Sequence, residues 1–447
     1  MQDTVITNAR LVNEGHIVEA DLLIRGARIE RIDGQIDTSG CTVIDADGRH
    51  LMPGMIDDQV HFREPGLTHK GDLESESIAA VAGGITSFMD MPNVKPATTT
   101  RAALADKYRL AAGRARANYA FYLGATNDNL AEIRALQPGE ACGVKVFMGA
   151  STGNLLVDDP QALEAIFRDS PLLIATHCED PQLIRDNEAD YQRRYGADIP
   201  MHCHPEIRSA QACLRSSSLA VDLARRHGSR LHVLHLTTAA EMALFEPGPV
   251  QGKRITAEVC VHHLHFDERD YAALGARIKC NPAIKGLHDR EALIEALLED
   301  RLDVVATDHA PHTADEKEGN YFAAPAGLPL VQHALPCLLE HWHHGHLPLE
   351  KLVQKTSHNV AIAYGVRERG FLREGYFADL VLVDLDEPLG VAADNLLYRC
   401  GWSPFEGHVF RSSVSATWVC GQLAWYEGEA QPAARGMRLE FEPTPRA

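Results

Sequence analysis

The sequence has no apolar stretch that approaches the roughly 20 residues of a membrane-spanning helix. Its first residues, MQDTVITNARLVNEG, contain neither the basic segment nor the apolar segment of a secretory signal peptide. The ten cysteines are scattered and form no Cys-x-x-Cys pair, which is typical of a reducing compartment and not of a disulfide framework. We therefore expect a cytoplasmic protein without a membrane partner.

Basic residues are also few relative to acidic ones. The chain has 43 Lys and Arg against 62 Asp and Glu, a formal net charge of −19. This balance argues against a nucleic acid or an anionic membrane as partner, because a phosphate backbone requires a basic face. It does not exclude a small anionic substrate, since one arginine in a cleft can bind a carboxylate. The hydrophobic share of 45% and the charged share of 23% are ordinary for a globular enzyme.

Both ends of the chain have the pattern of short β-strands. The first fifty residues alternate apolar runs with turn residues, and near the other end FADLVLVD (377–384) is typical of a buried strand. The middle of the chain differs. We therefore predict one small β-sandwich domain built from residues 1–52 and 366–447, and a second domain over residues 53–365.

The middle segment repeats short apolar runs that alternate with helical patterns. Near-continuous apolar strands between helices indicate a parallel sheet, and eight such units predict a (β/α)8 barrel. A gap of about 50 residues separates the fifth and sixth runs, and its segment IPMHCHPEIRSA predicts a loop over the active-site face. The eight runs are 51–62, 85–93, 117–126, 143–151, 172–180, 230–238, 254–263 and 303–312.

Polar side chains stand at the ends of these runs, where a barrel of this type carries its catalytic groups. Several histidines, a lysine and an aspartate from different strands would then converge on one place. Imidazole and carboxylate suit zinc or a similar divalent metal with positions left open for water. A single histidine of this kind is more often structural, but several at the strand ends of one barrel favour a metal site. The residues are His61, Arg63, Asn93, Lys145, His177, His235, Asp308, His309 and His312.

Three of these side chains suggest specific chemistry. Burial of Lys145 inside GVKVFMGA would lower the pKa of its amine, and a neutral amine can react with carbon dioxide to give a metal-binding carbamate. The alternative for Lys145 is that its amine snorkels toward solvent or forms an ion pair with a nearby acid. Asp308 could bind a metal and shuttle a proton, or could cap a helix. Arg63 offers a bidentate fork to a substrate carboxylate, or an ordinary surface ion pair.

The motifs resemble those of the amidohydrolase superfamily and, more narrowly, of the dihydroorotases. The matching segments are HFREPG (61–66), MPN (91–93), GVKVFMGASTG (143–153), THCED (176–180), VLHLTT (233–238), CNP (280–282) and ATDHAPH (306–312). The resemblance covers nearly the whole chain. It implies the reversible cyclisation of N-carbamoyl-L-aspartate to L-dihydroorotate, a step of pyrimidine synthesis.

The resemblance also implies roles for individual residues. One or two zinc ions would be bound by His61, Lys145 as its carbamate, His177, His235 and Asp308. Asp308 would act as general base in hydrolysis and as general acid in the reverse reaction. Arg63, Asn93 and His312 would hold the substrate carboxylate, while Asn281 and the backbone of Pro325, Ala326 and Gly327 would line the ring.

One position departs from the family pattern. The family usually has His-x-His at the end of the first barrel strand, and here Gln59 stands where the first histidine belongs. A glutamine oxygen is a weaker zinc ligand than imidazole. The site could keep two metals with one held loosely, or hold one metal on Lys145, His177 and His235, or be catalytically impaired. A further possibility is help from His202 or His204 on the long loop.

Two other functions compete with a dihydroorotase. One is a related cyclic-amide hydrolase (a dihydropyrimidinase, hydantoinase or allantoinase), against which Arg63 argues because a neutral ring does not need it. The other is a degenerate dihydroorotase that serves as a scaffold for aspartate transcarbamoylase, for which Gln59 is the support. We also expect self-association, a small anionic substrate and, from the resemblance, association with aspartate transcarbamoylase.

Overall fold

The computed structural model describes residues 2–149 and 154–442. The end of the fourth predicted run, residues 150–151, and residues 443–447 of the predicted terminal domain lie outside the described residues. Within the described ranges, no helix is both long enough and apolar enough to cross a membrane.

Nine parallel strands form a barrel with eight positions, because β8 and β9 both lie in the third predicted run; each of the others lies in a run of its own, so the barrel prediction is confirmed. The strands form two sheets, in the orders β14-β13-β12-β11-β10-β9 and β6-β7-β8. They meet where β8 continues into β9, and a parallel bridge between Val60 and His309 joins the other two edges. The bounds are β6 (Met55–Val60), β7 (Ile85–Asp90), β8 (Asn118–Phe121), β9 (Leu123–Gly124), β10 (Val144–Phe147), β11 (Ile174–His177), β12 (Leu231–Val233), β13 (Ile255–Cys260) and β14 (Val304–Ala306).

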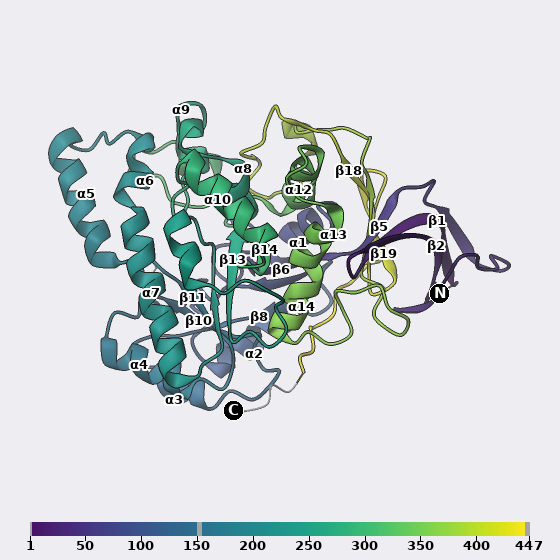
Figure 1. The fold of residues 1–447 in the computed structure, drawn as a ribbon, viewed down its shortest axis with the longest axis horizontal. Coiled ribbons are helices and arrows are strands. Elements are labelled where there is room, and N and C mark those ends of the chain that lie inside the picture. Colours follow the sequence, from purple (N-terminus) through teal and green to yellow (C-terminus); the bar gives the residue numbers. More distant parts are fainter. Residues whose placement is uncertain (1, 150–153, 443–447) are drawn as a thin grey trace.

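Helices surround the barrel strands (Figure 1). Several of the longer helices begin at a side chain that accepts hydrogen bonds from the first turn; Asp180, followed by Pro181, caps α5 in this way. The helices are α1 (Leu73–Ala82), α2 (Arg101–Ala111), α3 (Leu130–Arg134), α4 (Pro160–Asp169), α5 (Pro181–Tyr195), α6 (His204–Ile207), α7 (Ala210–His227), α8 (Val261–His265), α9 (Tyr271–Leu274), α10 (Leu287–Leu298), α11 (Ala314–Lys317), α12 (Ala334–His343), α13 (Leu349–Val353) and α14 (Asn359–Tyr364).

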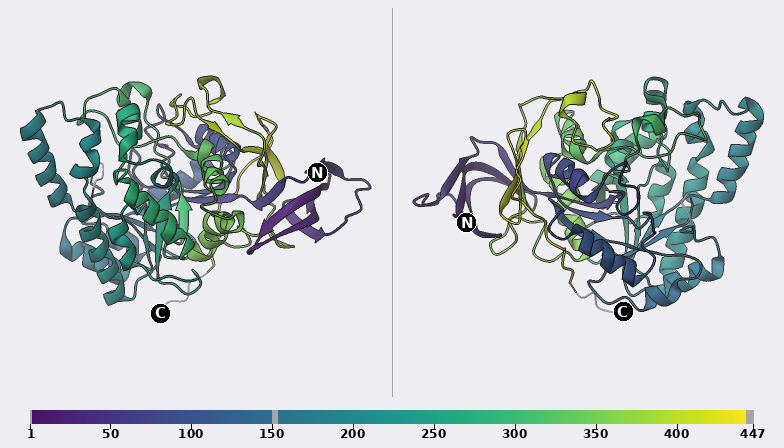
Figure 2. Two further views of the ribbon diagram at one scale, coloured as in Figure 1. Left: turned by 45° about the horizontal axis from the view of Figure 1, so that its top comes forward. Right: turned by 180° about the vertical axis from the view of Figure 1, so that it is seen from behind.

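Strands from both ends of the chain share one nine-stranded sheet beside the barrel (Figure 2). Its order is β20-β19-β18-β15-β5-β1-β2-β3, with β4 paired to β1, and the central pair β15–β5 joins the two ends of the sequence. The strands are β1 (Thr4–Asn13), β2 (His16–Arg25), β3 (Arg28–Asp33), β4 (Thr42–Asp45), β5 (His50–Pro53), β15 (Leu380–Asp384), β18 (Ser413–Val419), β19 (Gln422–Tyr426) and β20 (Glu429–Ala430). Two short strands, β16 (Leu389–Gly390) and β17 (Val409–Phe410), form a separate ribbon.

Two stretches of the C-terminal segment lie against the barrel and not in this sheet. The Tyr119 N–H donates to the Met437 carbonyl at 3.0 Å, and the Leu439 N–H donates to the Tyr119 carbonyl at 2.9 Å. The Trp402 indole donates to the His312 carbonyl at 2.7 Å, at the carboxyl end of the barrel strands. The division of the chain at residues 52 and 366 stays a prediction.

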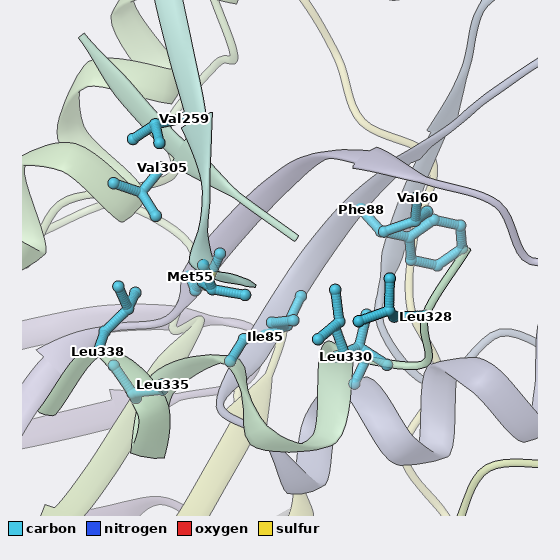
Figure 3. Packing of buried hydrophobic residues seen from close by; sticks show 14 of the residues in the cluster. Met55, Val60, Ile85, Phe88, Val259, Val305, Leu328, Leu330, Leu335 and Leu338 are labelled. Carbon is cyan, nitrogen blue, oxygen red and sulfur yellow. The ribbon is translucent and has the colours of Figure 1, made fainter. Parts of the chain in front are cut away.

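The barrel strands are held to the helices by continuous apolar packing. Figure 3 shows Met55 of β6 and Ile85 of β7 close to Leu335 and Leu338 of α12. All four side chains are at most 2% exposed. Burying each side chain of this size contributes about 1.5–3 kcal/mol to stability. Packing of these apolar side chains therefore holds the barrel strands in place. A catalytic site at the strand ends requires such a fixed position.

Candidate active site

One cavity of about 320 Å³ opens at the carboxyl ends of the barrel strands. Each of the twelve residues predicted to bind metal or substrate contributes to its wall, together with Gln59, Phe147 and Ala310. The structure thus brings together residues that lie up to 266 positions apart in the sequence, from His61 to Gly327. The predicted residues in the wall are His61, Arg63, Asn93, Lys145, His177, His235, Asn281, Asp308, His312, Pro325, Ala326 and Gly327.

Three residues of this wall have left-handed backbone. The φ angles are 68° at Arg63, 38° at His235 and 50° at Asp308. Side chains other than glycine rarely adopt positive φ, and such strain of about 1–3 kcal/mol gathers at functional sites, where the surrounding structure enforces it. The three residues follow β6, β12 and β14, so the strain lies where each strand delivers a side chain to the cavity.

His177 and His235 form one half of a metal-binding arrangement. His177 Nδ1 and His235 Nε2 are 3.0 Å apart, and both side chains are buried. The other ring nitrogen of His177 lies 2.8 Å from the Glu179 carboxylate, which Arg208 holds in turn. A carboxylate behind a ligand histidine fixes its tautomer and directs the free lone pair toward a metal. Two ligands of one tetrahedral zinc lie about 3.3 Å apart, so the spacing fits.

His61, Asn93 and Asp308 form the opposite half. His61 Nδ1 lies 2.7 Å from Asn93 Oδ1, and His61 Nε2 lies 3.0 Å from Asp308 Oδ1. A hydrogen-bond acceptor therefore faces each ring nitrogen of His61. This arrangement suits an imidazole with protons on both nitrogens, and it also suits a metal ion that replaces the Nε2 proton. Burial raises the pKa of the Asp308 carboxyl, but the hydrogen bond from His61 and neighbouring positive charges outweigh it and lower the pKa below its usual value.

Gln59 occupies part of this second half. Its Nε2 donates to the same Asp308 oxygen over 3.1 Å. Among the described residues Asp308 Oδ2 has no hydrogen-bond partner, whereas Oδ1 is shared by Gln59 and His61. Oδ1 is therefore already held by two protein side chains, and Oδ2 is the Asp308 oxygen that remains open to a metal or a proton.

Lys145 lies between the two halves, on β10. Its side chain is 1% exposed, and Nζ lies 4.7 Å from the centre of the Phe147 ring. In the part of the chain that the structure describes, no carboxylate oxygen lies within the 4.0 Å of an ion pair with Nζ, which removes the ion-pair alternative. Burial lowers the pKa of Lys145 to about 8, against the opposing effect of the Asp308 and Glu258 carboxylates. The neutral amine that carbamate formation requires is therefore far more populated than in an ordinary lysine; the carbamate itself stays a prediction.

Arg63 and His312 form a basic wall on the other side of the cavity. Arg63 donates from Nε to the Pro311 carbonyl at 3.0 Å, and one terminal nitrogen lies 3.1 Å from His312 Nε2. Within residues 2–149 and 154–442, no carboxylate lies within 4.0 Å of its guanidinium. Burial lowers the pKa of Arg63 to about 10, a value at which it is still charged at neutral pH. A buried, charged and unpaired guanidinium creates a strong preference for an anion in the cavity.

The loop that carries Pro325, Ala326 and Gly327 is held by two buried lysines, which sequence reasoning missed. Lys317 Nζ donates to the Pro325 carbonyl at 2.8 Å and to the Gly327 carbonyl at 3.0 Å. Lys279 Nζ donates to the Ala324 carbonyl at 2.7 Å. A side chain at position 327 would place its Cβ 2.4 Å from the Ala310 carbonyl oxygen, so only glycine fits there.

Three predicted participants lie outside the cavity wall. His309 turns away from the cavity and pairs with the buried Glu76 carboxylate at 2.9 Å, because successive side chains point to opposite sides of the chain. His202 is exposed. His204 is buried in α6, within the segment between β11 and β12, and its ring contacts the Tyr321 hydroxyl at 2.9 Å and the Cys280 carbonyl at 2.7 Å. Neither loop histidine replaces the one missing at position 59.

Two further groups of possible metal ligands lie behind the cavity. In each, one ligand atom per residue lies within 4.8 Å of the others, and every side chain is buried. One group is Asp58, His232 and Glu258, and the other is Cys260, His262 and His263. Both His262 ring nitrogens are buried without a hydrogen-bond partner. The carboxyl end of β13 contributes to both groups.

Comparison with known proteins identifies the relatives of this chain. The model described as "Amidohydrolase family" matches residues 50–424. A dihydroorotase of Methanosarcina acetivorans is 34% identical, over 98% of this chain and 96% of that protein. An allantoinase of Deinococcus radiodurans is 32% identical, over 98% of both. The solved structure of an L-hydantoinase (dihydropyrimidinase) from Arthrobacter aurescens matches with a TM-score of 0.93 at 28% identity, over 98% of this chain and 100% of that chain.

Proposed function

The chain belongs to the amidohydrolase family, and on that premise we propose that it is a metal-dependent dihydroorotase. It would interconvert N-carbamoyl-L-aspartate and L-dihydroorotate by closing or opening a cyclic amide. Relatives with about one third identity include an allantoinase as well as dihydroorotases, so the choice among cyclic amides rests on the cavity.

The observation that carries the choice is the unpaired charge of Arg63. Arg63 is 6% exposed and lines the cavity, and its guanidinium has no carboxylate partner among the described residues. Dihydroorotate carries a carboxylate on its ring, whereas hydantoin, dihydrouracil and allantoin are neutral. A charge-assisted pair with that carboxylate would satisfy Arg63, and a neutral ring would leave it buried and uncompensated. His312, on the same wall, and Asn93, which lies beside His61, would complete the carboxylate site.

The opposite wall fits a divalent metal. Its ligands would be His177, His235 and the carbamate of Lys145, with His61 and Asp308 forming a second position. When bound there, zinc supplies a Lewis acid that polarises the ring carbonyl and activates water. The support for a metal site is the set of possible ligand atoms. Two histidine ring nitrogens lie 3.0 Å apart, a carboxylate holds one of the two rings from behind, and a buried lysine amine of lowered pKa lies nearby.

The chain's own groups would orient the ring and move one proton. Asp308 Oδ2 is free of hydrogen bonds from the described residues, and the lowered pKa of Asp308 keeps the carboxylate ionised, so this open oxygen would accept a proton during hydrolysis. In the cyclisation direction the same oxygen would return it. Asn281, whose Oδ1 is buried without a partner, and the backbone of 325–327 would contact the ring polar atoms.

The test is turnover in both directions by the purified protein supplied with zinc and bicarbonate. We expect L-dihydroorotate to be hydrolysed and N-carbamoyl-L-aspartate to be cyclised. If the protein catalyses neither reaction, and if it contains almost no active-site zinc when purified without chelator, the result would instead favour a degenerate scaffold for aspartate transcarbamoylase. Self-association and that partnership are expectations carried over from the family.

A further inference from the structure

The barrel interior contains a strongly acidic cluster directly beneath the proposed catalytic cavity. Asp58 on β6, His232 on β12 and Glu258 on β13 are each 0% exposed. His232 Nε2 lies 3.1 Å from Asp58 Oδ2 and 3.4 Å from Glu258 Oε2. None of the three belongs to the residues that line the cavity.

The cluster favours positive charge at its centre. Burial disfavours a charged His232 imidazole, but the adjacent Asp58 and Glu258 carboxylates outweigh it and raise the pKa of His232 to about 9. Burial also raises the pKa of Glu258 to about 8, so protons neutralise the cluster where no metal is bound. No lysine or arginine nitrogen of the described residues lies within 4.0 Å of either carboxylate, so His232 is their only basic neighbour at that range. Both Asp58 oxygens are buried without a hydrogen-bond partner, and Oδ2 faces the His232 ring.

The orientation of His232 matches that of a metal ligand. Its Nδ1 lies 2.7 Å from the Thr256 hydroxyl, which itself donates to the Leu231 carbonyl, so Nδ1 carries a proton. Nε2 therefore faces the two carboxylates, and a metal bound there would take the place of the Nε2 proton. Donors around a tetrahedral zinc at about 2.0–2.1 Å lie about 3.3 Å apart, close to the two measured separations.

We propose that Asp58, His232 and Glu258 bind a zinc ion of their own, separate from any metal in the catalytic cavity. The ion would join β6, β12 and β13 one layer below the catalytic residues. Glu258 Oε1 accepts the backbone N–H of His235 at 2.9 Å, and Asp58 directly precedes Gln59. This zinc therefore has a structural role: it holds in place the strand ends that present Gln59, His61 and His235.

The two proposed metals can be distinguished experimentally, because their ligands differ in burial. The catalytic cavity is open to solvent, whereas the interior ligands are fully covered, and Tyr122 and Tyr364 adjoin them with hydroxyls 2.7 Å apart. A chelator at neutral pH should strip the cavity zinc within minutes to hours and should leave the interior zinc until the protein unfolds. Likewise, His177→Ala should lose the cavity zinc and retain the interior one.

The direct experiment is anomalous diffraction at the zinc edge from crystals of the full chain grown with zinc. We expect a peak among Asp58, His232 and Glu258, distinct from any peak at His177 and His235. A map with no peak at the interior position would overturn the proposal, and so would a peak at Cys260, His262 and His263 instead. The outcome of this diffraction experiment does not depend on which ring the enzyme hydrolyses.

Metal analysis of variants gives a second test. Glu258→Gln and Asp58→Asn should each lose one chelator-resistant zinc per chain. Glu241→Gln is the matched control, because Glu241 is also a buried glutamate with hydroxyl partners but lies outside the cluster. Unchanged chelator-resistant zinc in folded Glu258→Gln protein would show that two protons, and not a metal, neutralise the cluster.

Discussion

Gln59 donates a hydrogen bond from Nε2 to Asp308 Oδ1 over 3.1 Å, between β6 and the end of the neighbouring β14. A histidine at this position would instead offer a lone pair to a metal. The glutamine amide satisfies the carboxylate oxygen directly, and His61 shares the same oxygen. The side of the site formed by His61 and Asp308 is therefore held together by hydrogen bonds within the chain. On the side formed by His177 and His235, the buried Nδ1 of His235 has no hydrogen-bond partner among the described residues.

The first prediction concerns metal content at Gln59. Gln59→His should raise the cavity zinc from about one to about two ions per chain, because imidazole is the stronger ligand. Inductively coupled plasma mass spectrometry before and after chelator treatment measures this. Gln59→Asn is the control, since it shortens the side chain without adding a ligand. Equal zinc in the wild type and Gln59→His would mean that position 59 does not control the second metal.

The second prediction concerns the carboxylate wall. Arg63→Met should lower kcat/KM for L-dihydroorotate by on the order of 10²- to 10³-fold, because a buried charge-assisted pair is lost. Zinc content should stay unchanged. Arg109→Met removes the same charge from an exposed helix position and should have no effect on turnover. A comparable loss in both variants would assign the effect to net charge and not to recognition.

The third prediction concerns Lys145. Lys145→Ala should abolish turnover and reduce cavity zinc, because the carbamate that would bridge to the metal cannot form. Electron density extending beyond Nζ in the wild type is the structural check. An unmodified amine at full zinc occupancy would rule out the carbamate.

The fourth prediction concerns the loop at 325–327. Lys317→Met should raise KM for L-dihydroorotate roughly tenfold with little change in kcat, since two hydrogen bonds that fix the loop are lost. Lys355→Met is a matched control, because Lys355 is an equally buried lysine that donates to the Leu302 carbonyl outside the cavity wall. An unchanged KM in Lys317→Met would show that the loop does not depend on this lysine.

The sequence predicts the barrel well because its strands are buried on both faces and appear as separate apolar runs. It also identifies the residues that converge, since a strand end is a defined place in a barrel. It cannot show which way a side chain turns there: His309 looks equivalent to Asp308 beside it, yet its ring pairs with Glu76. Sequence patterns also do not reveal contacts to backbone carbonyls in irregular loops, so Lys317 is not identified.

Long-range placement of the C-terminal segment is likewise hidden from the sequence. The indole of Trp402 holds the carbonyl of His312, a residue of the carboxylate wall, although position 402 reads as part of a terminal β domain. The cluster of Asp58, His232 and Glu258 is another example. Each residue is unremarkable in its own strand, and only closure of the barrel brings the three together.

The central claim is that this cavity selects a ring with a carboxylate, and one comparison tests it most directly. Dihydrouracil is dihydroorotate without that carboxylate, so the ratio of kcat/KM for the two substrates isolates the contribution of Arg63 and its wall. The account predicts a ratio on the order of 10³ or more in favour of L-dihydroorotate. Equal turnover of both rings, or turnover of dihydrouracil alone, would contradict it.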